Sequence, residues 1–446
     1  MPLLGDAADG TDHDFTSAPE LDFHAYYFTG KAILEGEPFV GWAITDISFL
    51  TEKAYVYTPV TAPLFVPFAL FPEWQIPYVL NMLLLCGVFF AIGRLCLQLL
   101  DDYGVTLDRI DRVLIMAFCL FSGHTVLGVY RGNVDPAILL VLAVGLLAIE
   151  RGRGARGGAL WAGAALFKLF PAFLGVYLLY RRAYRAIAAA VVVGVGFMLL
   201  GVAIFGIDAH VDFVEFILHE RSREGAFQGG LDPTLQWITL RRPFSQVLAL
   251  SGNQLFLLTT ALVAPVVYLV YREADSELDR IVAFFATMVA MLITIIPSTL
   301  NYVVYLYFPL VPLLYLVEDR RTKLLFVAGM VLVNVPLYPH HVATILEGLP
   351  LSPGIADALA DAVRAVLRWA SIPLYGFLLI LAGCVRYART PTPAAAAASP
   401  TPEPGAEPGV GNGITSGSMK TTNCDTVAVT NHERLYDRTV PPPYLM

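Results

Sequence analysis

The feature that most constrains this chain is a series of long stretches without charged side chains. The longest, Ile281–Val317, has room for two bilayer crossings of about 20 residues each. Charged residues make up only 15% of the chain, whereas a water-soluble domain carries about 25%. The mean hydropathy of +0.63 agrees with this deficit. The sequence therefore predicts an all-α, polytopic transmembrane helix bundle with about nine to eleven membrane segments, its site carried by extracytoplasmic loops.

The other apolar stretches predict where these segments lie. Gly157–Tyr180 belongs to the set although it contains Lys168. Ala54–Pro72 has no charged residue but carries four prolines, which favours a broken or re-entrant segment. We expect a second break at Pro297–Tyr302. The remaining predicted spans are Trp74–Gly93, Val113–Tyr130, Pro136–Ile149, Ala186–Ile207, Asn253–Tyr271, Leu324–Leu346 and Trp369–Val385.

Basic residues set the predicted orientation. One arginine cluster precedes Gly157–Tyr180 and another follows it, so a single crossing would place one cluster outside, against the positive-inside tendency. A helical hairpin that reverses near Lys168 keeps both clusters inside, and we prefer it. The clusters are Arg151, Arg153 and Arg156, then Arg181, Arg182 and Arg185. This topology predicts a multi-pass cell-membrane protein with its chemical-looking residues outside and its C-terminal tail in the cytoplasm.

Three regions follow from this reading. Residues 1–57 form an extracytoplasmic N-terminal loop with an acidic motif, residues 58–386 form the multi-span bundle, and residues 387–446 form a Pro/Ala/Gly/Thr-rich tail that we expect to be disordered. We see no signal peptide in the first ten residues.

Composition also argues against some partners. The net charge is −8, with the acids mainly in loops and tail, which weighs against nucleic acid. The five cysteines fit neither a metal-site spacing nor a disulfide framework. His340 and His341 have no carboxylate or cysteine at helical spacing, so we interpret them as loop residues and predict no metal site.

Five short motifs occur in order along the chain. Asp22–Tyr27 reads Asp-Phe-His-Ala-Tyr-Tyr, in a helix predicted from Asp22 to Leu34 with Gly36 as its stop. The others are Tyr57–Pro59, Arg131–Asn133, Phe167–Pro171 and Pro297–Tyr302. Together they resemble the polyprenyl-phosphate-dependent membrane glycosyltransferases of the C superfamily, and within these glycosyltransferase family 87, which includes mannosyltransferases. The resemblance covers about residues 20–385.

The chain departs from the family pattern in three places. The family usually has a transmembrane helix before the acidic motif, whereas this chain begins almost directly at the loop. Asn301 stands where a histidine is expected, and no tryptophan follows Ser298. These departures keep open a catalytically inactive family member or assembly partner.

The resemblance implies a reaction and its participants. An acceptor hydroxyl, on a lipid or glycan, attacks the anomeric carbon of a polyprenyl-phosphate-linked hexose, with mannose as the default, at the outer membrane face. Asp22 is the expected general base, although an aspartate there also suits a helix N-cap. The expected substrate-binding residues are Tyr26, Tyr27, Tyr57, Arg131, Asn133, Lys168, Arg221, Arg223 and Asn301. No cofactor is implied, and membrane lipids are the remaining expected partners.

Alternatives stay open for several of these residues. Lys168 is a costly charge in an apolar stretch, which indicates function, but it could instead extend to an interface. Arg221 and Arg223 suit the leaving phosphate, or lipid headgroups. Tyr26 and Tyr27 suit an interfacial aromatic belt as well as a sugar. The competing function is a transporter or lipid flippase, but we find no repeat, and only Lys168 lies deep in an apolar stretch.

Overall fold

A computed structural model describes residues 22–42, 54–220, 224–272, 274–295, 298–335 and 337–390. They belong to one compact unit, Met1–Pro391, and the second unit, Thr392–Met446, lies outside the described residues. The regular elements of the described chain are helices, apart from a pair of two-residue antiparallel strands, β1 (Gly41–Trp42) and β2 (Ala54–Tyr55). The predicted all-α class is therefore confirmed.

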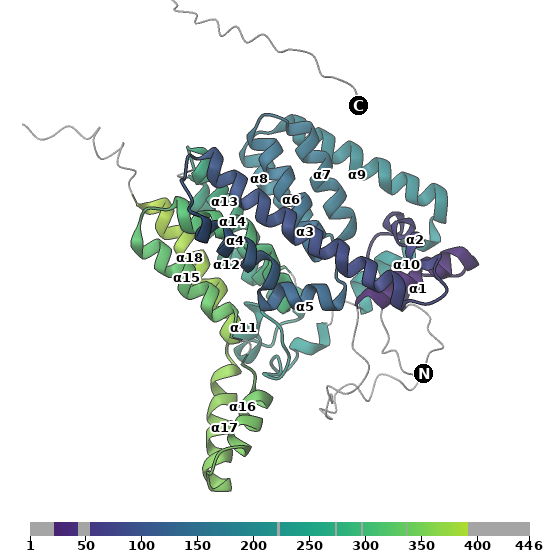
Figure 1. The fold of residues 1–446 in the computed structure, drawn as a ribbon. Helices are drawn as coiled ribbons and strands as arrows, with labels where there is room; N and C mark the ends of the chain where they lie inside the picture. Colours follow the sequence, from purple (N-terminus) through teal and green to yellow (C-terminus); the bar gives the residue numbers. More distant parts are fainter. Residues whose placement is uncertain are drawn as a thin grey trace, which may run out of the picture. The chain divides into compact units, whose positions relative to one another are not determined.

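The α-helices, in chain order, are α1 (Asp22–Glu35), α2 (Val66–Ala69), α3 (Gln75–Asp102), α4 (Arg109–Phe121), α5 (Gly123–Arg131), α6 (Asp135–Glu150), α7 (Gly154–Phe167), α8 (Gly175–Tyr180), α9 (Tyr184–Phe205), α10 (Asp208–Glu215), α11 (Arg241–Val247), α12 (Gly252–Arg272), α13 (Glu277–Thr294), α14 (Tyr307–Leu316), α15 (Arg320–Val333), α16 (Pro339–Glu347), α17 (Pro353–Leu367) and α18 (Ile372–Arg389). Short 3₁₀ or π turns are η2 (Pro59–Phe65), η3 (Phe170–Leu174), η4 (Phe216–Glu220), η5 (Glu224–Phe227) and η6 (Leu300–Leu306). Figure 1 shows their arrangement.

Five helical segments within the described residues are long and apolar enough to cross a membrane. They are Gln75–Asp102, Arg109–Arg131, Tyr184–Phe205, Gly252–Arg272 and Pro353–Arg389. In α9, only 6% of the residues in the most apolar stretch are buried. Because such a surface is unfavourable in water, the open face of α9 must contact lipid. The chain is thus a multi-pass membrane protein, while the larger predicted number of segments stays a prediction.

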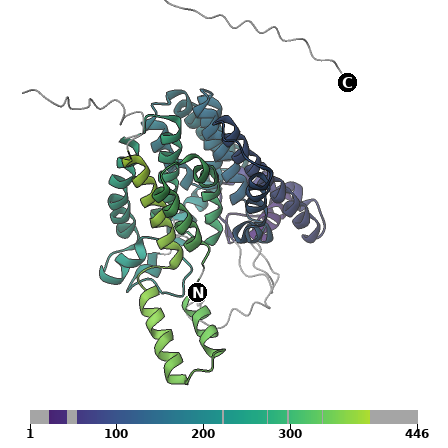
Figure 2. The ribbon, with the colours of Figure 1, turned by 60° about the vertical axis from the view of Figure 1, so that its left-hand side comes forward.

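One predicted span is wrong. Leu324–Leu346 was expected to form a continuous crossing, but α15 ends at Val333 and α16 starts afresh at Pro339. Proline has no backbone N–H to donate and fits best in the first turn of a helix, so Pro339 begins a helix rather than continuing one. Figures 1 and 2 both show α16 and α17 as a hairpin that extends beyond the ends of α15 and α18.

The predicted hairpin around Lys168 is confirmed. Helix α7 ends at Phe167, Lys168 adopts an extended conformation, and η3 and α8 lead the chain back. At the far end, Arg181 forms an ion pair with Glu150, whose side chain is fully buried. Both arginine clusters therefore lie at the same end of the bundle.

Small residues allow α7 and α9 to approach closely at this end. A Cβ atom added at Gly158 would lie 2.0 Å from the backbone oxygen of Ala186, whereas one at Gly163, on the same helix, would have no neighbour within 4 Å. Close approach of backbones through small residues is a common packing mode of membrane helices. Gly158 is therefore a packing requirement of the fold.

We expect Gly158→Ala to destabilise the protein by about 1–3 kcal/mol, because the added methyl group must push α7 and α9 apart. Gly163→Ala is the matched control and should be neutral or slightly stabilising, since alanine favours the helix. Thermal unfolding of the purified proteins in one detergent measures both. Equal melting temperatures for the two variants would contradict the tight α7–α9 contact.

Candidate functional site

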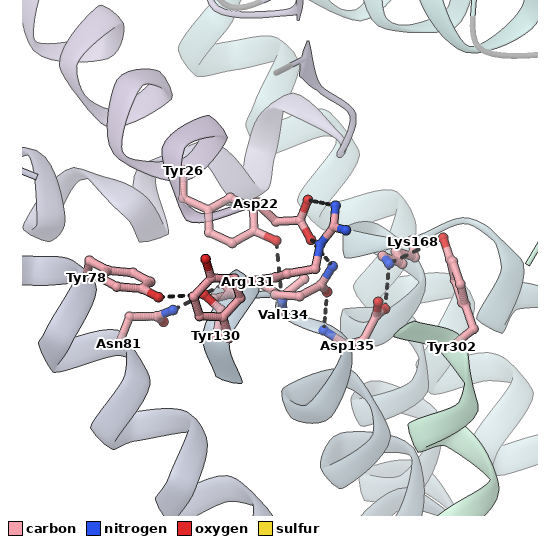
Figure 3. A network of polar contacts seen from close by, with 12 residues as sticks. Asp22, Tyr26, Tyr78, Asn81, Tyr130, Arg131, Val134, Asp135, Lys168 and Tyr302 are labelled. Carbon is pink, nitrogen blue, oxygen red and sulfur yellow. Dashed lines mark hydrogen bonds and ion pairs between the residues drawn. The ribbon is translucent and has the colours of Figure 1, made fainter. Parts of the chain in front are cut away.

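The acidic residue of the first motif contacts residues of the third. Asp22, the first residue of α1, accepts hydrogen bonds from Arg131 Nε at 3.0 Å and Nη2 at 3.2 Å. Asn133 Nδ2 donates to the same carboxylate at 2.8 Å. Figure 3 shows the Asp22 and Arg131 side chains facing one another. The Asp22 side chain is 20% exposed, so a further molecule can reach it.

A glycine fixes the turn that carries these partners. Gly132 has a φ of +67°, a left-handed conformation that glycine adopts most readily. A Cβ atom there would lie 2.8 Å from Cβ of Phe23, the neighbour of Asp22 on α1. From α3, Tyr78 donates to the Tyr130 carbonyl and Asn81 to the Gly132 carbonyl. The turn is thus held against α1 on one side and α3 on the other.

A buried ion pair lies next to this turn. Asp135, at the start of α6, is 1% exposed and pairs with Lys168, whose side chain is 11% exposed. Tyr305 donates to the same carboxylate oxygen at 2.7 Å. Lys168 Nζ also lies 3.4 Å from the Tyr302 hydroxyl and 4.5 Å from the centre of that ring. Figure 3 shows Lys168 between Asp135 and Tyr302.

One side chain links the Asp22 carboxylate to the backbone of Asp135. Asn133 donates to Asp22 through Nδ2 and accepts from the Asp135 backbone N–H through Oδ1, at 2.8 Å in each case. The Asn133 side chain therefore links half-buried Asp22 to the residue whose carboxylate forms the buried ion pair. By the network we mean Asp22, Arg131, Asn133, Asp135 and Lys168.

Residues of the motif Tyr57–Pro59 form hydrogen bonds to residues that lie beside the network. Tyr57 and Tyr26 share a hydrogen bond between their hydroxyls at 2.9 Å, and Tyr26 also accepts from the Val134 backbone N–H. Thr58 donates through its hydroxyl to the Leu166 carbonyl, two residues before Lys168. These contacts connect α1, the 131–135 turn and the α7 end.

The predicted substrate-binding residues occupy different places. Arg131, Asn133 and Lys168 belong to the network. Tyr26 and Tyr57 are buried next to it. The remaining four lie elsewhere or outside the described residues, and their roles stay predictions.

Of these four, Tyr27 donates to the carbonyls of Phe71 and Pro72, away from Asp22. Asn301 is half-buried on η6, and its side chain makes no hydrogen bond to any residue that the structure describes. Arg221 and Arg223 lie outside the described residues.

Sequence reasoning assigned no role to Asp135, Tyr302 or Tyr305. Asp135 lies in the turn before Pro136, Tyr302 ends the motif Pro297–Tyr302, and Tyr305 lies in an apolar stretch. The usable signal was the unexplained cation: a lysine in an apolar stretch needs a partner. Asp135 begins the neighbouring apolar stretch and was the acid to consider.

Two further buried cations serve the fold. Arg241 donates to the Thr294 and Ile295 carbonyls at the end of α13, and Arg242 donates to three carbonyls of the 232–237 segment. Burial lowers the pKa of both guanidinium groups to about 10, which leaves them charged at neutral pH. A cation at the carbonyl end of α13 also complements the helix dipole.

Comparison with known families identifies the matched region. The sequence model of glycosyltransferase family 87 matches residues 55–301, more than half of the chain. This range contains Arg131, Asn133, Asp135 and Lys168, whereas Asp22 precedes it. No curated protein matches the chain.

Proposed function

Because the chain belongs to glycosyltransferase family 87, we propose that it transfers a hexose, with mannose as the default, from a polyprenyl-phosphate sugar to a lipid or glycan acceptor. Asp22 is the general base. The observation that carries this proposal is the convergence of Arg131 and Asn133 on an accessible carboxylate, next to the Asp135–Lys168 pair.

The proposed chemistry is a single displacement. The acceptor hydroxyl forms a bond to the anomeric carbon, the bond from that carbon to the phosphate oxygen breaks, and the phosphate leaves with the electron pair. Asp22 takes the hydroxyl proton. Its pairing with Arg131 fits this role, because an ionised carboxylate is the form that can accept a proton.

Lys168 is the proposed cation for the leaving phosphate, together with Arg221 and Arg223. An ammonium group has three N–H donors, and Asp135 and Tyr302 accept from two of them. We assign the third donor to a phosphate oxygen of the lipid donor. Positive charge directed at the oxygen where negative charge develops lowers the barrier to bond cleavage.

The location of the network supports a lipid donor. Arg131 is the last residue of the candidate span Arg109–Arg131, so the acid and its partners lie where a membrane span ends. A polyprenyl phosphate places its charged group at that depth and its chain in the hydrocarbon. A transporter would instead need its ionisable groups around a path near the membrane midplane.

Helix α6 supports an extracytoplasmic site. It begins at Asp135 in the network and ends at Glu150, beside the arginine clusters, and is 16 residues long. At 1.5 Å per residue the two ends are about 24 Å apart, most of the hydrocarbon thickness. Because basic clusters favour the cytoplasm, the network end faces outward.

This orientation predicts a labelling pattern. Cysteine introduced at exposed Glu35, at the end of α1, should react with a membrane-impermeant maleimide in intact cells. Cysteine at exposed Arg153, beside the other end of α6, should react only after the membrane is permeabilised. The reverse pattern would place the network in the cytoplasm and contradict the proposed outer-face reaction.

The proposed activity itself is tested by incubating the purified protein with a labelled polyprenyl-phosphate hexose and a membrane-lipid extract. We expect a labelled glycolipid or glycan. Absence of product with every hexose of a donor panel, from a protein shown to be folded, would favour an inactive member or a transporter.

A further inference from the structure

The end of the bundle opposite Asp22 contains a second charged region that the proposed reaction does not use. A pocket of about 430 Å³ lies there, within the range of about 300–1,000 Å³ typical of small-molecule sites. It is lined by Ile149, Gly152, Gly154 and the continuous segment Arg181–Ala186. We propose that this pocket binds the phosphate headgroup of an anionic phospholipid.

The first argument is uncompensated positive charge. Arg151 pairs with Asp102, and Arg181 shares the Glu150 carboxylate with Arg280, so these cations have acidic partners. Four others have no carboxylate within 4.0 Å among the residues that the structure describes: Arg153, Arg156, Arg182 and Arg185. Arg182 and Arg185 line the pocket itself. An anion placed there gains the attraction of groups that no protein acid satisfies.

The second argument is that two helices start at the pocket. Arg153 precedes α7 and Ala183 precedes α9, and neither helix has a side-chain cap for its first backbone N–H groups. A Cβ atom added at Gly154 would lie 3.6 Å from the backbone nitrogen of Ala186, so the two helix starts lie side by side. Tyr184 and Ala186 donate their backbone N–H groups to nearby carbonyls, so the remaining first-turn N–H groups and the positive ends of two helix dipoles add to the arginine charge. Phosphate oxygens can accept hydrogen bonds from both kinds of donor.

The third argument identifies the anion as a lipid. Apolar side chains beside the pocket are open rather than packed: Leu179 is 66% exposed and Tyr184 is 71% exposed. Along α9 the open surface continues through Val191 and Val192, whose side chains are 57% and 71% exposed. A phosphate in the pocket would leave attached acyl chains lying against this surface. A basic pocket between membrane helices next to an apolar outer face is typical of anionic lipid headgroup sites.

The test is competition between lipids for the purified protein. Detergent-solubilised protein is given equal amounts of phosphatidylglycerol and phosphatidylcholine, and bound lipid is measured by native mass spectrometry. Thermal unfolding in each lipid is the second readout. We expect the wild type to retain phosphatidylglycerol in preference, and to melt at a higher temperature with it than with phosphatidylcholine.

The variant Arg182→Gln/Arg185→Gln removes two pocket cations and should lower the affinity for phosphatidylglycerol about 30-fold. Arg320→Gln/Arg321→Gln is the matched control, because it removes two exposed cations from α15, away from the pocket, and should retain the preference. Melting in phosphatidylcholine shows whether each variant is folded.

Three outcomes would contradict the proposal. The wild type could bind both lipids equally, or the α15 control could lose the preference as fully as the pocket variant. Inorganic phosphate alone could also raise the melting temperature as much as phosphatidylglycerol, which would indicate a soluble anion. None of these outcomes bears on sugar transfer, which depends on the other end of α6.

Discussion

Replacing Asp22 by asparagine is expected to lower the turnover number for sugar transfer by about 10²–10⁴-fold, the usual contribution of a positioned general base. Asparagine keeps an oxygen that can accept from Arg131 and Asn133, but it cannot take a proton. The Michaelis constant for the lipid donor should change little, because the change removes an interaction of the transition state. Initial rates at several donor concentrations separate the two constants.

Glu35→Gln is the matched control for this prediction. It neutralises an exposed acid at the other end of the same helix and should leave transfer unchanged. Melting temperatures of both variants should stay close to that of the wild type. Full activity of Asp22→Asn would reject the base and leave Asp22 as a residue that anchors α1 to the 131–135 turn.

The second large effect concerns the buried pair. Asp135→Asn or Lys168→Met alone should destabilise the protein by about 3–5 kcal/mol, because each leaves one charge buried without its partner. The double variant Asp135→Asn/Lys168→Met leaves no charge and should recover most of this stability. Thermal unfolding of the four proteins gives the coupling between the two positions.

Activity of the double variant distinguishes a structural pair from a functional one. If Lys168 interacts with the leaving phosphate, the folded double variant should remain deficient in transfer by about tenfold or more. A double variant that regains both stability and wild-type transfer would limit the pair to a structural role. Because the double variant is expected to recover its stability, a loss of transfer in that variant cannot be explained by unfolding.

The sequence predicts much of this fold because its signals are local. Uncharged stretches mark membrane helices, Gly36 marks the end of α1, and prolines mark the break before α3. The paired arginine clusters predict the reversal at Lys168. The expected span Leu324–Leu346 fails because hydropathy alone does not register the restart of a helix at Pro339.

The site was predictable as a set of residues but not as a set of contacts. Asp22 and Arg131 are 109 residues apart, and Tyr305 and Asp135 are 170 apart. The local sequence around each residue does not show which helices pack against one another. An acid between Asn133 and Pro136 has the same local pattern whether it faces water or a buried lysine, so Lys168 indicates that a partner is needed and packing shows that the partner is Asp135.

The most direct test of the central claim compares donor classes with one acceptor extract. Purified wild-type protein and Asp22→Asn receive the same labelled hexose, either on polyprenyl phosphate or as a sugar nucleotide. We predict product from the lipid-phosphate donor with the wild type alone. Equal product from both proteins would contradict the role of Asp22, and product from the sugar nucleotide without a lipid carrier would contradict the proposed donor.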